Sequence, residues 1–480
     1  MRFIIFGAGL SGLSCAAALK RHGHEVTVIE KEHEVGGLAR SFRINGYTFD
    51  YGPHFLFGEK VYHLIRKHYP EIDVKMLHST KEKMFFRNKY FNFPFDPKNI
   101  LQKIERRKVP GILLEMAVKK ILWKKPSNGF GNVEDWVIQA VGRRIYNYIS
   151  LGGYIKKLYG LPPRDISQEW GIQKLKFLAK WRDANFIQLV SKSFSEGGNV
   201  KKRVIHYPGT GIDDISRKIS ETLQRAGGRI LFNSEAICFK HRSEGVSITM
   251  RRGGKEEQIE GDFVVSTIPI TQLTTMLSPQ PPAEIVKKVT TMRYRTLLLL
   301  YLLINKERVL DHQCIYFTED QFFFRRITEF RHLDSSMVPA GKTSLCVEIT
   351  CFEEEDISHW GKEDLSRIVI EQLEHLNYIR RNDIEGIHFL RIPYAYPVYE
   401  VHADKILAQV LAFLESYARL VSIGLQGLFH YNAMYSSILS GDELGVRLSA
   451  SDPREWKKIV QETYGNRIEK YNQKTSEVLT

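Results

Sequence analysis

The sequence predicts an α/β fold, and three features of its first thirty residues lead to that prediction. Residues 3–6 form a short apolar run suited to a buried parallel strand. Gly7, Gly9 and Gly12 then make a G-x-G-x-x-G turn, which opens a helix over residues 10–21. A second apolar strand over residues 26–29 ends at Glu30. Strand, glycine turn, helix, strand and acid in this order predict a Rossmann-like, dinucleotide-binding unit.

Each part of this motif has a physical role. The first glycine permits the tight turn, the second lets the backbone approach a pyrophosphate, and the third lets the helix pack closely on the strand. Leu10 and Ser11 begin the helix, where free N–H groups attract the phosphates. Glu30 follows Gly7 by 23 residues, the spacing at which an acid reaches a ribose hydroxyl pair, and Lys31 comes next. We therefore place these residues in a cofactor site.

A second glycine pair distinguishes between the common dinucleotides. Gly36 and Gly37 come shortly after the acid, and Leu38, Arg40 and Ser41 follow them. Many FAD proteins have a glycine pair at this place, where bare backbone passes close to the cofactor. NAD dehydrogenases generally lack such a pair. The sequence therefore predicts FAD, with these five residues in its site.

Composition sets wider limits. The chain has 480 residues, 43% of them hydrophobic and 26% charged, which is an ordinary globular mixture and enough for more than one domain. The formal net charge is +14. An excess of positive charge can bind nucleic acid, an anionic membrane or an anionic substrate. The alternative is a solvated basic surface with no partner. No nucleic-acid-binding motif is visible, so we expect no nucleic-acid partner.

Other patterns concern metals and location. The five cysteines form no C-x-x-C pair and there is no H-E-x-x-H, so we expect a reducing compartment and no metal. The first strand begins at residue 2, which leaves no room for a signal peptide, and no apolar run reaches about 18 residues. We predict a cytoplasmic protein, with peripheral contact at the inner membrane face left open. The oligomeric state is not predicted.

Residues 101–125 are the strongest candidate for membrane contact. They contain eight Lys or Arg and two Glu, interleaved with apolar residues. One interpretation is a helix that lies on anionic lipid. The other is a surface helix that packs its apolar stripe inward, and we favour this second interpretation.

The remaining chain is divided by its periodicity. Helical patterns with proline and glycine breaks cover residues 61–68, 100–107, 111–123, 134–150 and 166–179. Alternating apolar strands dominate residues 290–400, and the run 297–304 suits a buried strand. We predict a discontinuous FAD-binding domain (1–60, 205–270 and 405–450), a mostly helical insert (61–204), a substrate domain with an antiparallel sheet (271–404), and a C-terminal helix and tail (451–480).

Several stretches together resemble one group of flavoproteins. They are G-A-G-L-S-G-L, V-G-G-L-A-R-S-F, F-D-Y-G-P-H, Y-P-G-T-G-I, D-F-V-V-S-T-I-P, Y-P-V-Y-E and S-I-G-L-Q-G-L-F-H-Y-N-A-M. In this order the chain resembles the FAD-dependent amine oxidase and protoporphyrinogen oxidase superfamily. Within it, the chain is most similar to UDP-galactopyranose mutase and its oxidoreductase-like relatives. The resemblance covers roughly residues 2–442 and implies a glutathione-reductase-like flavin fold with an inserted helical region and an α+β substrate domain.

The resemblance also implies site residues. In the family, residues matching the glycine motif and Glu30 bind the ADP part of FAD, and Ala236 would contact the adenine. A stretch beside the isoalloxazine matches Gly52, Pro53, His54 and Phe55. A C-terminal stretch closes the flavin site at a helix N-terminus, where the dipole stabilises negative charge on the reduced flavin. Its matching residues here are Gly424, Gly427, Leu428 and Met434.

The chain departs from the mutases at several positions. Phe57 replaces a second histidine, Leu425 replaces an arginine able to clamp pyrophosphate, and Tyr435 and Ser436 replace an acid and a histidine. These changes argue against simple mutase activity but leave the glycine and backbone contacts to FAD in place.

Three functions follow as alternatives. The first is an FAD-dependent oxidoreductase that transfers hydride between a small molecule and the flavin, with His54, Tyr431 and Tyr435 as candidate catalytic residues that equally suit structural roles. The second is a flavin-dependent isomerase acting on a nucleotide sugar in glycan biosynthesis. The third is a flavoprotein kept only for partner or membrane binding. The candidate phosphate binders for an anionic or nucleotide-linked substrate are Arg143, Arg144, Arg293, Arg295, Arg325 and Arg326.

Overall fold

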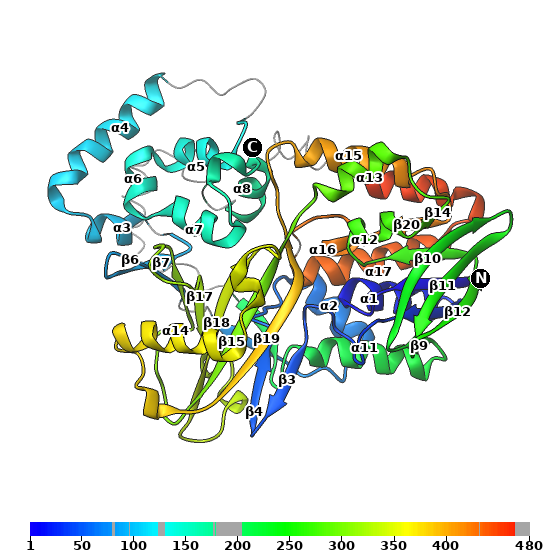
Figure 1. Ribbon diagram of the computed structural model, residues 1–480, viewed down its shortest axis with the longest axis horizontal. Coiled ribbons are helices and arrows are strands. Elements are labelled where there is room, and N and C mark those ends of the chain that lie inside the picture. Colours follow the sequence, from blue (N-terminus) through cyan, green and yellow to red (C-terminus); the bar gives the residue numbers. More distant parts are fainter. Residues whose placement is uncertain are drawn as a thin grey trace.

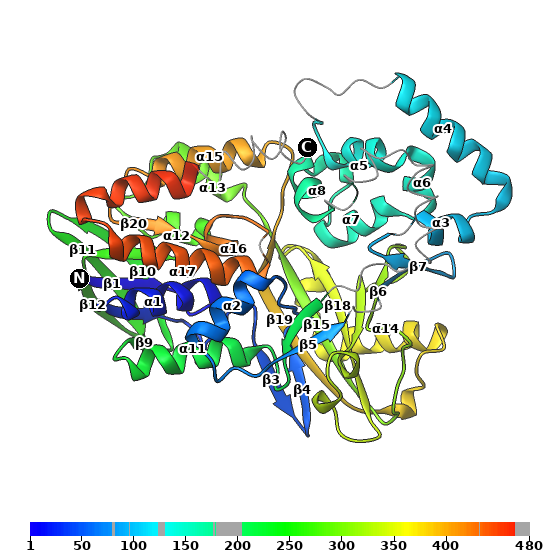
Figure 2. The same cartoon turned by 180° about the vertical axis from the view of Figure 1, so that it is seen from behind.

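A computed structural model describes residues 1–78, 82–95, 97–122, 130–175, 178, 204–431 and 433–465. Predictions for residues 123–125, 176–177, 179–203, 432 and 466–480 fall outside these ranges. The molecule has three parts: a parallel-sheet region that holds the N-terminus, a large mixed sheet beside it, and a group of helices next to that sheet (Figures 1 and 2). The predicted α/β class with a Rossmann-like FAD-binding fold is confirmed.

A five-stranded parallel sheet forms the centre of the first part. Its strands follow the order β20 (Leu420–Ser422), β13 (Phe263–Ser266), β1 (Arg2–Phe6), β2 (Glu25–Ile29) and β9 (Arg229–Leu231), and every neighbouring pair is parallel. Four of the five residues of β1 and of β2 are buried, as continuous apolar strands between two helical layers require. The chain therefore returns to this sheet three times after leaving it.

Helices α1 (Leu10–Arg21), α11 (Asp213–Arg225) and α17 (Met434–Ala450) pack on this sheet, and α1 contacts both of the others. The contact between α1 and α17 is unusually close. A Cβ added to Gly441 would lie 2.3 Å from the carbonyl oxygen of Ser11, and one added to Gly445 would lie 2.7 Å from that of Cys15. Because only glycine allows this approach, the middle of α17 packs directly on the first half of α1. Cys15 itself is fully buried.

A second sheet extends this region. Its order is β12 (Lys255–Gly261), β11 (Gly245–Arg252), β10 (Ser234–Arg242) and β14 (Leu277–Ser278). Helices α13 (Ala283–Thr290) and α15 (Ala403–Leu414) contact each other, and α12 (Ile270–Thr275) contacts α13. Helix α16 (Gly424–Gly427) follows β20 and contacts α17.

The large sheet has seven strands and is antiparallel except between β16 and β6. Its order is β19 (Ile384–Pro397), β15 (Tyr294–Ile304), β18 (Thr343–Cys351), β17 (Arg326–Glu329), β16 (Cys314–Phe317), β6 (Glu82–Phe86) and β7 (Lys89–Phe93). Strand β15 is buried along nearly its whole length, in agreement with the strand predicted at 297–304. Helix α14 (Lys362–His375) contacts β15 and β19.

Residues 61–204 were predicted as a mostly helical insert, and the described part of this interval also contains strands. Strands β6 and β7 form a hairpin whose turn residues Arg87 and Asn88 have φ of 49° and 55°, as a two-residue turn of this hand requires. This hairpin completes the large sheet. Strand β5 (Val74–His78) pairs with β8 (Val204–Pro208), and β3 (Ser41–Ile44) pairs with β4 (Tyr47–Asp50).

The described residues of this interval also form helices. They are α2 (Glu59–His68), α3 (Pro97–Lys103), α4 (Val109–Leu122), α5 (Val133–Val141), α6 (Arg143–Tyr148), α7 (Leu151–Tyr159) and α8 (Gln168–Lys174). The single helix predicted at 134–150 is broken at Gly142, whose φ of 83° cannot continue a helix. Short 3-10 turns connect several elements: η1 (Arg106–Lys108), η2 (Pro163–Asp165), η4 (Phe330–His332), η5 (Ser335–Met337), η6 (Asp356–His359), η7 (Arg381–Asp383) and η8 (Pro453–Glu455).

Two kinds of feature are absent from the described residues. No helix among them is long and apolar enough to cross a bilayer. Within the same ranges, no three His, Cys, Asp or Glu side chains gather in a way that could hold a metal ion.

Candidate functional site

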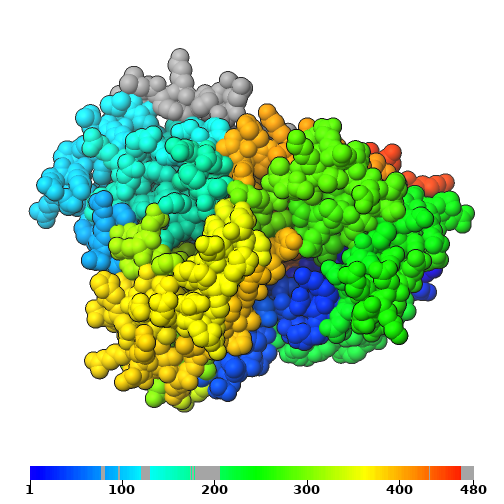
Figure 3. All heavy atoms as spheres, viewed as in Figure 1, coloured from blue at the N-terminus to red at the C-terminus, as the bar shows by residue number. Residues whose placement is uncertain are grey.

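A cavity of about 1810 Å³ lies where the three parts of the molecule meet. It begins at the carboxyl ends of β1 and β2, the edge where open parallel sheets bind their ligands, and it extends to β17 and β19 of the large sheet. Helix residues such as Tyr154 and Leu158 of α7 line its far end. In Figure 3, N-terminal residues in blue lie at the bottom of a hollow between the yellow and gold large sheet and the green strands.

The glycine turn has the geometry of a phosphate cradle. Gly7 has φ of 93°, and a Cβ added to Gly12 would lie 2.1 Å from the Gly7 carbonyl oxygen, so both positions need glycine. At Gly9 the nearest atom to an added Cβ is the Cα of Gly37, at 4.0 Å. Gly9 lines the cavity and caps α1 without a side-chain hydrogen bond. Bare backbone and the first turn of α1 are therefore presented to a ligand.

The second glycine pair lies directly beside this turn. Gly36 donates its N–H to the Ala8 carbonyl at 2.9 Å and forms a β-bridge with Gly9. The φ values of Gly36 and Gly37 are 113° and 58°. The Arg40 guanidinium donates from Nε to the Gly37 carbonyl at 3.0 Å and thereby holds the loop. Two glycine-rich loops thus form one wall of backbone along the cavity.

Glu30 directly follows β2 and connects the two loops. Its carboxylate accepts hydrogen bonds from the N–H groups of Ala8 at 2.6 Å and Glu32 at 3.0 Å. Burial raises the pKa of Glu30, while these two hydrogen bonds oppose that rise. The carboxylate lines the cavity with free lone-pair positions, as a ribose-binding acid requires.

A buried network missed by the sequence analysis supports this wall. Asp50 is fully buried and accepts hydrogen bonds from the hydroxyls of Ser41 and Tyr207, both at 2.7 Å, and from the Ile212 N–H at 3.1 Å. Its backbone carbonyl accepts from the Tyr301 hydroxyl at 2.7 Å. Asp50 therefore ties β4 to β8, the start of α11 and β15, and it fixes the turn that follows at residues 52–54.

Burial raises the pKa of Asp50 to about 6, although the hydrogen bonds from Ser41 and Tyr207 act in the opposite direction. Ser41 was predicted to bind the cofactor. In the structure its hydroxyl is committed to Asp50, and Ser41 is not among the cavity-lining residues.

His54 lies on the cavity wall with a defined tautomer. Its Nδ1 lies 2.9 Å from the Gly52 carbonyl oxygen, which can only accept, so Nδ1 carries the proton. Burial lowers the pKa of His54, the Gly52 hydrogen bond opposes this, and the charge of Arg326 lowers the pKa further. A neutral ring with a protonated Nδ1 leaves Nε2 as an acceptor.

Two adjacent arginines, Arg325 and Arg326, line the cavity beside a buried acid. Strands β17 and β18 pair in a register that sets Arg326 opposite Glu348. Arg325 donates from Nη2 to Glu348 at 2.6 Å and to the Tyr396 hydroxyl at 3.0 Å, and Arg326 donates from Nε to the other Glu348 oxygen. Glu348 is fully buried behind the arginines, which line the cavity themselves.

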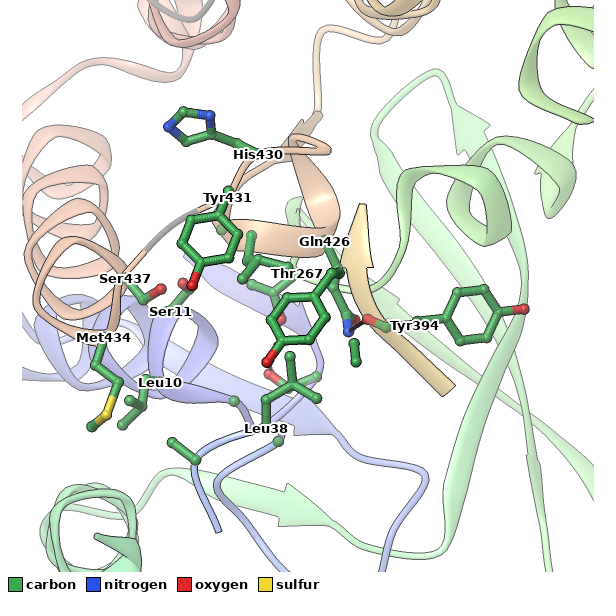
Figure 4. A pocket seen from close by; sticks show the side chains of 18 of the residues that line it. Leu10, Ser11, Leu38, Thr267, Tyr394, Gln426, His430, Tyr431, Met434 and Ser437 are labelled. Carbon is green, nitrogen blue, oxygen red and sulfur yellow. Dashed lines mark hydrogen bonds between the residues drawn. The ribbon is translucent and has the colours of Figure 1, made fainter. Parts of the chain in front are cut away.

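The predicted residues divide according to this geometry. Arg143, Arg144, Arg293 and Arg295 do not line the cavity. Tyr431 lines it and stacks with Tyr396, their ring centroids 6.0 Å apart. The side chains of Tyr431, Leu38 and Met434 surround one space, whereas the ring of Tyr394 points away (Figure 4). The other predicted site residues that line the cavity are Gly7, Leu10, Ser11, Lys31, Arg40, Gly52, Pro53, Phe55, Ala236, Gly424, Leu428 and Tyr435.

Gly427 and Gly12 lie behind the lining. A Cβ at Gly427 would lie 2.6 Å from the Ser422 hydroxyl, so this glycine closes the β20–α16 turn. These observations fit FAD: two glycine loops with room for a pyrophosphate, an acid at the end of β2, and a cavity that continues past residues 52–54. A glycine turn with a purely structural role would need neither the acid nor the adjoining cavity.

The sequence matches the profile of the family described as flavin containing amine oxidoreductase over residues 10–391. The chain belongs to this family. The predicted superfamily, the flavin cofactor and the class of flavin-dependent oxidoreductase enzymes are thereby confirmed.

Individual relatives match this chain either over a short stretch or at low identity. The chain is 32% identical over 110 residues to a 4,4'-diapophytoene desaturase of Staphylococcus aureus, and the match spans 22% of this chain and 22% of that protein. The fold is similar to reduced UDP-galactopyranose mutase, with a TM-score of 0.77, 20% identity, and coverage of 95% of this chain and 98% of the mutase.

Two further structures show the same fold. An Exiguobacterium protein assigned as a protoporphyrinogen oxidase gives a TM-score of 0.75 with 14% identity over 94% of this chain and 99% of its own. Putrescine oxidase bound to putrescine gives 0.60 with 15% identity over 94% of this chain and 100% of its own. All these identities are low, so the structures establish the fold of this oxidoreductase and not its substrate.

Proposed function

We propose that this protein transfers hydride between FAD and a small-molecule substrate that carries an anionic group. One observation supports both parts. A single cavity connects the glycine cradle at Gly9 and Gly37 with Arg325 and Arg326. A molecule bound at the arginine end would therefore share one enclosed space with the cofactor.

The arginines suit an anionic group because one donor is unused. Arg325 is 7% exposed, and its buried Nε has no hydrogen-bond acceptor within the described ranges. An unsatisfied buried donor on a charged group costs about 1.5–3 kcal/mol, which a carboxylate or phosphate oxygen would recover. Glu82 also lines the cavity and accepts a hydrogen bond from the Tyr316 hydroxyl at 3.0 Å. Because this carboxylate would repel an anion, the anionic group of the substrate belongs at the Arg325 end.

Aromatic rings enclose the rest of this compartment. Phe93, Tyr154 and Tyr316 line the cavity, and the ring centroids of Phe93 and Tyr316 lie 4.8 Å apart. Arg325 lies over the Tyr396 ring at 5.4 Å. Such walls exclude water and favour a substrate whose body is apolar or planar.

His54 is positioned to handle the proton. When bound, FAD would supply the hydride acceptor, and the loss of hydride from H–C–X–H requires that a proton leave X, an oxygen or nitrogen. With Nδ1 held by Gly52, the neutral ring of His54 accepts at Nε2. We assign His54 the role of accepting that hydrogen bond and proton, while Tyr431 and Tyr435 shape the space opposite.

Anaerobic reduction of the bound flavin tests this proposal. The FAD-loaded protein is mixed with a panel of amines and alcohols, each with and without a carboxylate or phosphate, and loss of the oxidised flavin absorbance is recorded. We expect bleaching only by members that carry the anionic group. Arg325→Lys keeps the charge but removes Nε. The KM of this variant for the anionic substrate should rise roughly 10- to 100-fold, as the loss of a charged hydrogen bond implies.

The matched control is Arg293→Lys, since Arg293 pairs with Glu400 and Glu354 outside the cavity. Equal bleaching by neutral and anionic partners would contradict the anionic-substrate proposal. A flavin that no member bleaches would favour the non-enzymatic alternative.

A nucleotide-sugar isomerase is the second candidate, because two adjacent arginines also suit a diphosphate. It predicts a different redox requirement. The isomerase should need prior reduction with dithionite and should then turn over without consuming reductant. Leu425 and Tyr435 line the cavity at positions where the mutases have polar groups, which is why we rank this candidate second.

We also propose that the protein acts in the cytoplasm at the inner face of a membrane. The support is the basic balance of the chain, concentrated in residues 101–125. Fractionation of cells expressing the full chain tests this location.

A further inference from the structure

Helix α4 has apolar residues on two opposite faces. Ile112 is 2% exposed and belongs to the core of the helical region, and Val109 and Met116 pack against the same core. Leu113, Leu114 and Val118 are 42%, 65% and 43% exposed. The favoured prediction of inward packing therefore describes only one side of this helix.

The outward residues form a continuous patch. Leu114 and Val118 are four residues apart and so lie one above the other on the helix, with Leu113 and the exposed Ala117 beside them. We call these four residues the α4 outer face. Large side chains exposed as a group on one helix usually mark a contact surface. Helix α4 projects from the edge of the molecule, away from the five-stranded parallel sheet and the large sheet (Figures 1 and 2).

Several cations precede α4 or lie beside it. The described stretch 97–122 has seven Lys or Arg against two Glu. Arg106 and Arg107 precede α4 in η1, and the side chain of Arg107 is 83% exposed. Arg143 and Arg144 of α6 add two exposed guanidiniums. The Glu115 carboxylate on α4 accepts the backbone N–H groups of both residues and so holds them beside α4.

Three acids lie among these cations. Glu105 pairs with Arg107 and Lys108, Glu115 lies near Arg144, and Glu134 lies 4.0 Å from Arg143. The pairs reduce the positive charge without cancelling it. A second copy of the same surface would bring these cations together, so self-association is disfavoured by charge. An anionic surface is favoured.

We propose that the α4 outer face inserts into the interface of an anionic phospholipid membrane, with the flanking arginines and lysines on lipid phosphates. Helices that lie in a membrane interface combine an apolar face with a basic surround, as here. This inference gives a surface to the proposed membrane location and does not depend on the flavin reaction.

Vesicle binding by the full, FAD-loaded protein tests the inference. We expect the protein to sediment with vesicles of equal parts phosphatidylcholine and phosphatidylglycerol, and to bind pure phosphatidylcholine at least tenfold more weakly. Each cation removed near a charged bilayer should weaken binding about fivefold, so Arg106→Gln with Arg107→Gln should weaken it about 25-fold. Leu114→Gln with Val118→Gln keeps the helix and the charge but should weaken binding at least tenfold.

Met76→Gln is the matched control, because Met76 is 58% exposed on β5 and should leave binding unchanged. The flavin absorbance of each variant checks that it is folded and loaded. The inference is overturned if the wild type ignores anionic vesicles, or if the Leu114 and Val118 double variant binds like the wild type. It is equally overturned if that double variant changes only the oligomeric state by light scattering.

Discussion

Substituting alanine for Gly9 separates cofactor binding from folding. Gly9 has φ of −72° and ψ of 172°, which alanine adopts without strain. An added Cβ would have only the Gly37 Cα as a neighbour, at 4.0 Å. The FAD-free protein should therefore lose no stability, and it should gain about 0.4–1 kcal/mol because the unfolded chain is more restricted.

The same methyl group projects into the space assigned to the pyrophosphate. Forcing one extra carbon into a filled site costs about 1–3 kcal/mol. This corresponds to a rise of roughly 5- to 150-fold in the Kd for FAD. We expect a normally folded protein that loads FAD poorly.

Two other glycines give the contrast. Gly131→Ala adds a Cβ with no neighbour within 4 Å, away from the cavity, so it should show the same gain of about 0.4–1 kcal/mol and leave the FAD affinity unchanged. Gly12→Ala places a Cβ 2.1 Å from the Gly7 carbonyl and should reduce stability and FAD binding together. Stability is measured by urea unfolding of the FAD-free protein, and affinity by quenching of FAD fluorescence. Wild-type affinity in Gly9→Ala would refute the assignment of the pyrophosphate to this loop.

Three further predictions concern the groups around the site. Glu348→Gln leaves two buried guanidiniums uncompensated and should destabilise the protein by about 3–5 kcal/mol in urea unfolding. The control Glu353→Gln removes a half-exposed carboxylate and should cost less than about 1 kcal/mol. Similar losses for the two variants would mean that Glu348 is solvated. Burial raises the pKa of Asp50 from 3.8 to about 6, so the folded state keeps a proton that the unfolded chain loses. Stability should therefore fall by about 3 kcal/mol between these pH values, and Asp50→Asn should remove this slope; an unchanged slope would contradict the assignment. Gly441→Ala should separate α1 from α17 and cost about 1–3 kcal/mol with loss of FAD, which absorbance reports; full FAD loading would show that the close contact is dispensable.

Much of the cofactor site was predictable because it is encoded locally. The turn residues Gly7 and Gly12 and the pair at Gly36 and Gly37 need backbone conformations or close approaches that only glycine provides. Their spacing along one βαβ unit is short, so the order of residues along the chain is also their order in space. The predicted strand at residues 297–304 was recognisable for a related reason, since its apolar run matches a fully buried strand.

The hairpin of β6 and β7 was missed because its role is not local. Its aromatic residues complete the large sheet by pairing β6 with β16, more than two hundred residues later. Residues 134–150 were predicted as one helix because the periodicity continues through Gly142, and only the φ of that residue ends it. A helical pattern reports which faces are apolar but not where the backbone turns.

The sequence by itself determined the family, the flavin cofactor and the position of the nucleotide-binding turn, because these depend on short motifs with strict steric requirements. Only the tertiary structure decided what surrounds the far end of the cavity. Arg326 meets Glu348 through the register of two antiparallel strands, and Asp50 meets Tyr207 across 157 residues. It also decided which side of α4 faces solvent. Such pairings follow from strand register and helix packing, which no local pattern in this chain specifies.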